Sequence, residues 1–147
     1  LQVSSRFVGR EGLVVGVDLK ETDVQLRNAV FVRADVMDEG LADLLRPYAP
    51  FGYDVVLSDL SPNISGAWEL DHARQIALSR RALGLARALM KEGGNAVFKA
   101  FQGEEFDGFL REVRSAFLEV HVVKPRASRS QSSELYIVAL GLRGARR

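Results

Sequence analysis

Short apolar runs rich in Val alternate along this chain with segments in which apolar residues recur at helical spacing. The apolar runs predict strands at residues 12–18, 30–34, 53–58, 95–100, 120–123 and 135–142. The helical spacing predicts helices at residues 71–90 and 105–117, with shorter helical segments near residues 1–8 and 41–45. Strands that alternate with helices indicate an α/β fold, in which helices cover both faces of a mainly parallel sheet.

A polar, basic loop at residues 124–133, rather than a helix, joins the last two predicted strands. A loop of about ten residues is short for the crossover that parallel strands need. We therefore expect the strand at residues 135–142 to run antiparallel to the others. Its start would then lie at the same edge of the sheet as the carboxyl ends of the parallel strands.

Three charged residues are predicted to meet at this edge. The run at residues 55–58 is typical of a strand buried on both faces, and it stops at Asp59, where a turn with Pro62 and Gly66 begins. Lys99 stands at the end of the strand at residues 95–100, and Glu134 directly precedes the last strand. Each has an ordinary explanation by itself: a turn acid, a surface lysine and a strand-start glutamate. Their convergence favours a functional site.

Two further acids follow predicted strands in the first part of the chain. Asp18 ends the strand at residues 12–18, and Asp35 follows the strand at residues 30–34. Acids at such positions bind the ribose hydroxyls of a nucleotide cofactor, and at the next strand end an adenine amino group. Capping of a turn or helix is the alternative for both carboxylates.

Composition narrows the classes of protein that fit. The 147 residues are enough for one domain, are 47% hydrophobic and 27% charged, and contain no apolar run as long as the roughly 20 residues of a membrane span. With no signal-peptide pattern, a cytoplasmic location is expected. The absence of Cys and the wide separation of His72 and His121 argue against a metal centre. The net charge of +1 is uninformative, but basic residues crowd the last quarter of the chain.

Four sequence runs resemble the FtsJ (RrmJ) family of ribosomal RNA 2′-O-ribose methyltransferases. In chain order they are GLVVGVDL, SDLSPNISG, VFKAFQGEEFDGFLREVRSAF and VVKPRASRSQSSELYIVALG. The similarity covers essentially the whole chain, and the combination of D-x-x-P-N, F-K-x-F-Q-G and S-x-E-x-Y is more selective than any one of these motifs.

The resemblance implies a role for each charged residue at the sheet edge. The family uses S-adenosylmethionine and a Lys-Asp-Lys-Glu tetrad, of which the Asp, the second Lys and the Glu match Asp59, Lys99 and Glu134. It implies that Lys99 is the base, that Asp59 orients it, and that Glu134 orients the lysine or the ribose. The cofactor-binding positions match Asp18, Leu19, Asp35, Val36 and Asp59. We expect phosphate contacts with RNA from Lys124, Arg126 and Arg129, although a solvated basic loop explains these residues equally well.

Two parts of the family pattern have no match in this sequence. They are the first tetrad lysine and the glycine-rich cofactor loop, and the sequence begins just past the place of that loop. The strand before the loop would lie between the strands that end at Asp18 and Asp59. The sequence could be a piece of a longer protein, another chain could fill the gap, or the sheet could be rearranged. We adopt the first explanation and expect these residues alone to bind cofactor poorly.

The sequence thus predicts a single Rossmann-like methyltransferase domain at residues 1–147, without its first strand. The expected reaction is S-adenosylmethionine-dependent 2′-O-methylation of a ribose in large-subunit ribosomal RNA, by a monomer that uses no metal and contacts no membrane. Two alternatives stay open: a catalytically inactive RNA-binding module, and an enzyme that acts on transfer or cap RNA. A nicotinamide-dependent dehydrogenase would leave Lys99 and Glu134 without a role.

Overall fold

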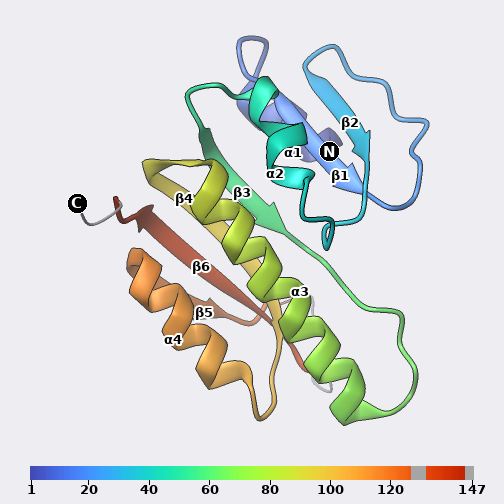
Figure 1. The fold of residues 1–147 in the computed structure, drawn as a ribbon, viewed down its shortest axis with the longest axis vertical. Helices are drawn as coiled ribbons and strands as arrows, with labels where there is room; N and C mark the ends of the chain where they lie inside the picture. The colour runs from blue at the N-terminus through green and yellow to red at the C-terminus, as the bar shows by residue number, and fades with distance from the viewer. Residues whose placement is uncertain (127–131, 145–147) are drawn as a thin grey trace. The chain divides into compact units, whose positions relative to one another are not determined.

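The predicted strands all form, and they belong to two separate sheets (Figure 1). The computed structural model describes residues 1–126 and 132–144. Its contacts divide the chain into two units, Leu1–Pro50 and Phe51–Arg147, which are described below one at a time. No helix in the described residues is both long and apolar enough to cross a membrane.

The first unit contains a two-stranded parallel sheet with a helix packed on it. Its elements are α1 (Gln2–Val8), β1 (Val14–Asp18), β2 (Ala29–Arg33), α2 (Leu41–Leu45) and the 3-10 turn η1 (Arg46–Tyr48). Strand β1 pairs with β2 so that Asp18 lies opposite Arg33. The side chain of Asn28 donates hydrogen bonds to the carbonyls of Ser5 and Gly9, at 2.9 and 2.6 Å, and so satisfies carbonyls at the end of α1.

The second unit contains a four-stranded sheet of mixed direction. Its elements are β3 (Tyr53–Ser58), α3 (Trp68–Leu89), β4 (Met90–Phe101), α4 (Phe106–Ala116), β5 (Phe117–Val123) and β6 (Glu134–Leu142). The strand order is β3-β4-β6-β5. Strand β3 is parallel to β4, whereas β6 is antiparallel to β4 and to β5. The antiparallel last strand predicted from the loop length is therefore confirmed.

Several element boundaries differ from the sequence prediction, and the largest differences are at the starts of α3, β4 and β5. Strand β5 begins at Phe117 rather than residue 120, directly after α4. Helix α3 begins at Trp68 rather than Asp71, because the Asp71 carboxylate reaches back to accept hydrogen bonds from the Ser65 and Gly66 N–H groups of the preceding turn. These hydrogen bonds, of which the one from the Ser65 N–H has the largest effect, lower the pKa of Asp71 below its usual range. Strand β4 begins directly after α3, and an irregularity in its pairing with β3 accommodates Gly93, whose φ is 80°.

Both helices of the second unit pack on the same face of its sheet. The core between them contains Phe98 from β4, Phe109 from α4 and Ile137 from β6, all fully buried, and the Phe98 and Phe109 rings meet edge to face at 6.1 Å. On β3, the side chains of Val55 and Leu57 are 52% and 62% exposed. The expectation that β3 is buried on both faces is therefore wrong for the described chain, because no helix of this unit covers its second face.

Candidate active site

Lys99 lies near the end of β4, in the part of that strand that extends beyond the end of β3. Strand β3 pairs with β4 as far as Ser58, which lies opposite Phe98, and then turns away at Asp59. On the other side, β6 pairs with β4 so that Tyr136 lies opposite Lys99 and Glu134 lies opposite Phe101. The Lys99 side chain is only 7% exposed, although its neighbour Asp59 is 74% exposed.

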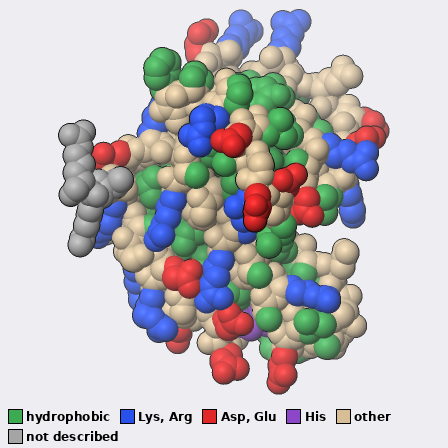
Figure 2. All heavy atoms as spheres, in the orientation of Figure 1, with side chains coloured by type: hydrophobic (Ala, Val, Ile, Leu, Met, Phe, Trp, Pro, Cys, Tyr) green, Lys and Arg blue, Asp and Glu red, His purple; other side chains and the backbone are tan. Residues whose placement is uncertain are grey.

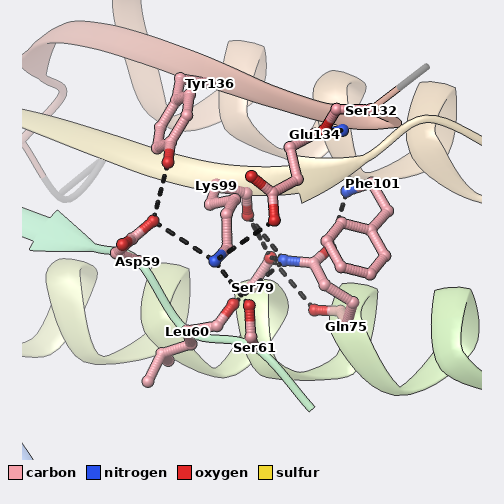
Figure 3. A network of polar contacts seen from close by, with 10 residues as sticks. All are labelled: Asp59, Leu60, Ser61, Gln75, Ser79, Lys99, Phe101, Ser132, Glu134 and Tyr136. Carbon is pink, nitrogen blue, oxygen red and sulfur yellow. Dashed lines mark hydrogen bonds and ion pairs between the residues drawn. The ribbon is translucent and has the colours of Figure 1, made fainter. Parts of the chain in front are cut away.

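The ammonium group of Lys99 is surrounded by three oxygen-bearing side chains (Figure 3). Its Nζ atom lies 3.4 Å from Asp59 Oδ1 and 4.0 Å from Glu134 Oε1, and it donates a hydrogen bond to Ser61 Oγ at 2.5 Å. The predicted meeting of Asp59, Lys99 and Glu134 at one sheet edge is thus found. This meeting follows from the antiparallel direction of β6, because the start of β6 at Glu134 pairs with the end of β4 at Phe101.

Tyr136 extends this group of charged side chains. Its hydroxyl donates a hydrogen bond to Asp59 Oδ1 at 2.9 Å (Figure 3). Burial, and then the hydrogen bond to Asp59 and its charge, raise the pKa of Tyr136 to about 12, so the phenol stays a neutral donor at ordinary pH. This tyrosine is the last residue of the S-x-E-x-Y motif, and no role for it was predicted from the sequence. The available signal was its position two residues after Glu134, which places both side chains on one face of a strand.

Gln75 from α3 takes the place of a strand where β3 has left the sheet. Its Nε2 donates to the Lys99 carbonyl at 2.9 Å, and its Oε1 accepts from the Phe101 N–H at 2.9 Å. A parallel strand would bond in the same way to the backbone of residues two apart. Ser79, one turn later, donates to the Lys99 carbonyl at 2.7 Å and accepts from Gln75 Nε2 at 2.9 Å. Both side chains are fully buried, and they hold the backbone that carries Lys99.

Gln75 and Ser79 were not predicted as site residues from the sequence. Their spacing of four residues places them on one face of the helix, beside the apolar stripe that packs on the sheet. Two polar residues at such positions are a weak signal, because their hydrogen-bond partners lie 20 or more residues away in the chain. Only the packing of α3 against the end of β4 identifies those partners.

The turn after β4 is anchored to the start of α3 by His72. Its Nε2 accepts a hydrogen bond from the Glu105 N–H at 3.1 Å, and its ring lies so close to Gly103 that a Cβ there would come within 2.6 Å. A glycine is therefore required at this position of the F-Q-G motif. No cluster of three or more His, Asp or Glu side chains in residues 1–126 and 132–144 is arranged to hold a metal ion.

Asp18 and Asp35 lie at one edge of the sheet in the first unit. Asp18 Oδ1 accepts a hydrogen bond from Lys20 N–H, and Asp35 Oδ1 accepts one from Met37 N–H, each at 2.9 Å. Both carboxylates therefore cap the turns that follow their strands, which is the ordinary role that the sequence left open. Both residues are also exposed, so each presents a carboxylate to solvent beyond the end of a parallel strand.

The predicted RNA-binding residues are only partly described. Lys124 is exposed and donates to the Ser132 carbonyl at 3.0 Å, and Arg126 is exposed in the turn that follows. Arg129 lies outside the described residues. Among the described residues on the face drawn in Figure 2, basic and acidic side chains are interspersed.

Comparison with known proteins finds a matching family model and similar curated proteins. Residues 1–142 match the family model described as FtsJ-like methyltransferase. A "Ribosomal RNA large subunit methyltransferase E" of Halorubrum lacusprofundi is 44% identical over 99% of this chain and 55% of its own length. A protein of the same name from Cenarchaeum symbiosum is 43% identical over 98% of this chain and 72% of its own length. The chain therefore spans about half the length of several curated relatives that it matches.

The fold also matches solved structures. A Plasmodium falciparum protein assigned as a ribosomal RNA methyltransferase superposes with a TM-score of 0.79, at 20% identity, over 90% of this chain and 73% of its own. At that level of identity the likeness concerns the fold alone. It agrees with the Rossmann-like methyltransferase fold that the sequence predicted.

Proposed function

The chain belongs to the FtsJ-like methyltransferase family, and on that premise we propose that it carries the methyl-transfer site of an RNA 2′-O-ribose methyltransferase. The observation that supports this most directly is the buried Lys99 side chain between Asp59 and Glu134 at the edge of the sheet. We propose large-subunit ribosomal RNA as the substrate, because that substrate is named for the curated relatives.

Lys99 is the proposed general base. A ribose hydroxyl is a weak nucleophile, so a base must take its proton as the oxygen attacks the methyl carbon. S-adenosylmethionine, when bound, supplies a methyl group activated by a positively charged sulfur. The neutral amine of Lys99 would accept the 2′-hydroxyl proton at Nζ, so that the hydroxyl oxygen becomes the nucleophile for that methyl group. Asp59 and Glu134 keep the amine at the sheet edge, and Tyr136 holds Asp59 in turn.

The cofactor would be held mainly by the first unit. Exposed carboxylates at the ends of parallel strands suit the hydroxyl and amino donors of an adenosine. In the described chain, Asp18 and Asp35 each use Oδ1 in a local turn, which leaves Oδ2 for a ligand. We therefore propose cofactor contacts from these acids and from their neighbours Leu19 and Val36. The cofactor contact expected of Asp59 stays a prediction.

Lys124, Arg126 and Arg129 are proposed to contact RNA phosphates. Such contacts add affinity that weakens with salt but carry no sequence information. The cytoplasmic location and the monomeric state stay predictions.

The decisive experiment measures methyl transfer from labelled S-adenosylmethionine to purified large ribosomal subunits. The whole protein is compared with Lys99→Met, which removes the proposed base, and with Lys91→Met as a matched control. Lys91 lies on the same strand but in an exposed pair with Asp54, 2.8 Å away. Removal of a general base lowers the rate by about 10² to 10⁴, whereas Lys91→Met should keep the wild-type rate. If Lys99→Met retains full activity, Lys99 is not the base, and a wild-type protein that labels no RNA would refute the function itself.

A further inference from the structure

The shortest contact of the Lys99 ammonium is with Ser61 rather than with either carboxylate. The distance from Nζ to Ser61 Oγ is 2.5 Å, against 3.4 Å to Asp59 Oδ1 and 4.0 Å to Glu134 Oε1. Hydrogen bonds from nitrogen to oxygen are normally about 2.7–3.2 Å long, so the contact with Ser61 is shorter than this range and the distances to both carboxylates are longer. Figure 3 shows Ser61 reaching Nζ from the loop that follows β3.

The groups that face Nζ differ in charge. The end of β3 contributes Asp59, and β6 contributes Glu134 and the phenol of Tyr136, which binds Asp59. Helix α3 contributes only uncharged groups, Gln75 and Ser79, and these bind the Lys99 carbonyl rather than Nζ. Among the described residues, Ser61 is therefore the uncharged hydrogen-bond acceptor of Nζ.

A neutral acceptor suits an amine that must change its protonation state. A carboxylate holds an ammonium by charge as well as by hydrogen bonding, and this favours the protonated form. A hydroxyl accepts an N–H from the ammonium and, more weakly, from the neutral amine. It can therefore keep Nζ in place with much less preference for the charged form, and the amine's lone pair can point elsewhere.

We propose that Ser61 is a positioning residue that holds the Lys99 amine in both of its protonation states. This inference rests on the proposed function, in which Lys99 accepts the proton of the ribose hydroxyl. Ser61 is itself exposed, so its substitution leaves the core of the unit intact.

The test uses the whole protein with three substitutions at Ser61. Ser61→Ala should lower kcat about tenfold with little change in KM, because loss of alignment slows the chemical step. Ser61→Thr keeps the hydroxyl and should restore kcat to near the wild-type value. Ser61→Asp adds a third carboxylate, which favours the ammonium, so the rise of kcat with pH should move about one unit toward higher pH.

Ser58→Ala is the matched control. Ser58 precedes Asp59, and its buried hydroxyl has no hydrogen-bond partner among the described residues. Loss of this hydroxyl should leave kcat and its pH profile unchanged. An NMR titration of the ¹³Cε resonance of Lys99 provides a second readout that needs no turnover. Its midpoint should move to lower pH in Ser61→Ala and to higher pH in Ser61→Asp.

The outcomes separate this inference from the proposed function. If Lys99→Met abolishes activity but Ser61→Ala keeps the wild-type kcat and Lys99 titration, the role of Ser61 is refuted and the base assignment stands. A loss in Ser61→Ala that Ser61→Thr does not restore would also overturn the inference, because it would show a role other than that of the hydroxyl. If wild-type protein transfers no methyl group, the proposed function fails, and the NMR titration still decides whether Ser61 holds Lys99.

Discussion

Replacing Gln75 by Met would remove the side chain that continues the sheet beyond the end of β3. Met fills a similar volume but cannot bond to the backbone, so the buried Phe101 N–H would lose its acceptor at 2.9 Å. The Lys99 carbonyl would keep its hydrogen bond from Ser79 at 2.7 Å. The main cost is therefore one buried, unpaired N–H group, which is worth about 1–3 kcal/mol. We expect the free energy of unfolding to fall by about 2 kcal/mol.

Urea unfolding followed by circular dichroism measures this change. With a typical slope of about 2 kcal/mol per molar urea, the unfolding midpoint should fall by about 1 M without a change in slope. Ser79→Ala is the comparison, because it leaves the Lys99 carbonyl bonded to Gln75 Nε2 and orphans no backbone group. It should cost less, about 1 kcal/mol. Equal midpoints for wild type and Gln75→Met would refute the view that Gln75 replaces a missing strand partner.

Two further substitutions test the second and first units separately. Tyr136→Phe removes the hydrogen bond to Asp59 and should lower the methyl-transfer rate about three- to tenfold. The pKa of this phenol is 10.0 in the unfolded chain and about 12 in the fold, so the free energy of unfolding of the wild type should fall as pH rises from about 10 to about 12. In Tyr136→Phe this part of the pH dependence should be absent. Asp18→Asn should weaken the binding of S-adenosylhomocysteine, measured by calorimetry, by at least about tenfold. Asp23→Asn, in the exposed loop after β1, is the control and should bind as tightly as the wild type. Equal affinities of Asp18→Asn and the wild type would exclude Asp18 from the cofactor site.

The arrangement of the site suggests how it could hold a lysine and still present it to a substrate. The ammonium is nearly buried, with its backbone held by Gln75 and Ser79 from α3. Asp59 is largely exposed and Glu134 partly so. A ribose would therefore approach past the two carboxylates rather than through the helix-covered face. Substitutions in α3 should act through the position of Lys99, and substitutions at Asp59 or Glu134 through its surroundings.

Much of this site could be predicted from residue order alone. Apolar runs located the strands because each must bury side chains in a sheet, and the short loop before β6 indicated its direction because a crossover needs more residues. Together these two facts were enough to bring Asp59, Lys99 and Glu134 to one edge. Strand ends are determined by local sequence, and the edge they share by connectivity.

The hydrogen-bond partners of Lys99 were decided only by the tertiary structure. Ser61 lies 38 residues from Lys99, and Tyr136 lies 77 residues from Asp59, so no local pattern links them. The exposure of the second face of β3 could not be predicted either, because apolar residues such as Val55 and Leu57 indicate burial without showing which face the helices cover. A sequence records which groups can bond or be buried. Which of them meet depends on strand register and on the packing of α3 against β4, and neither can be read from residue order.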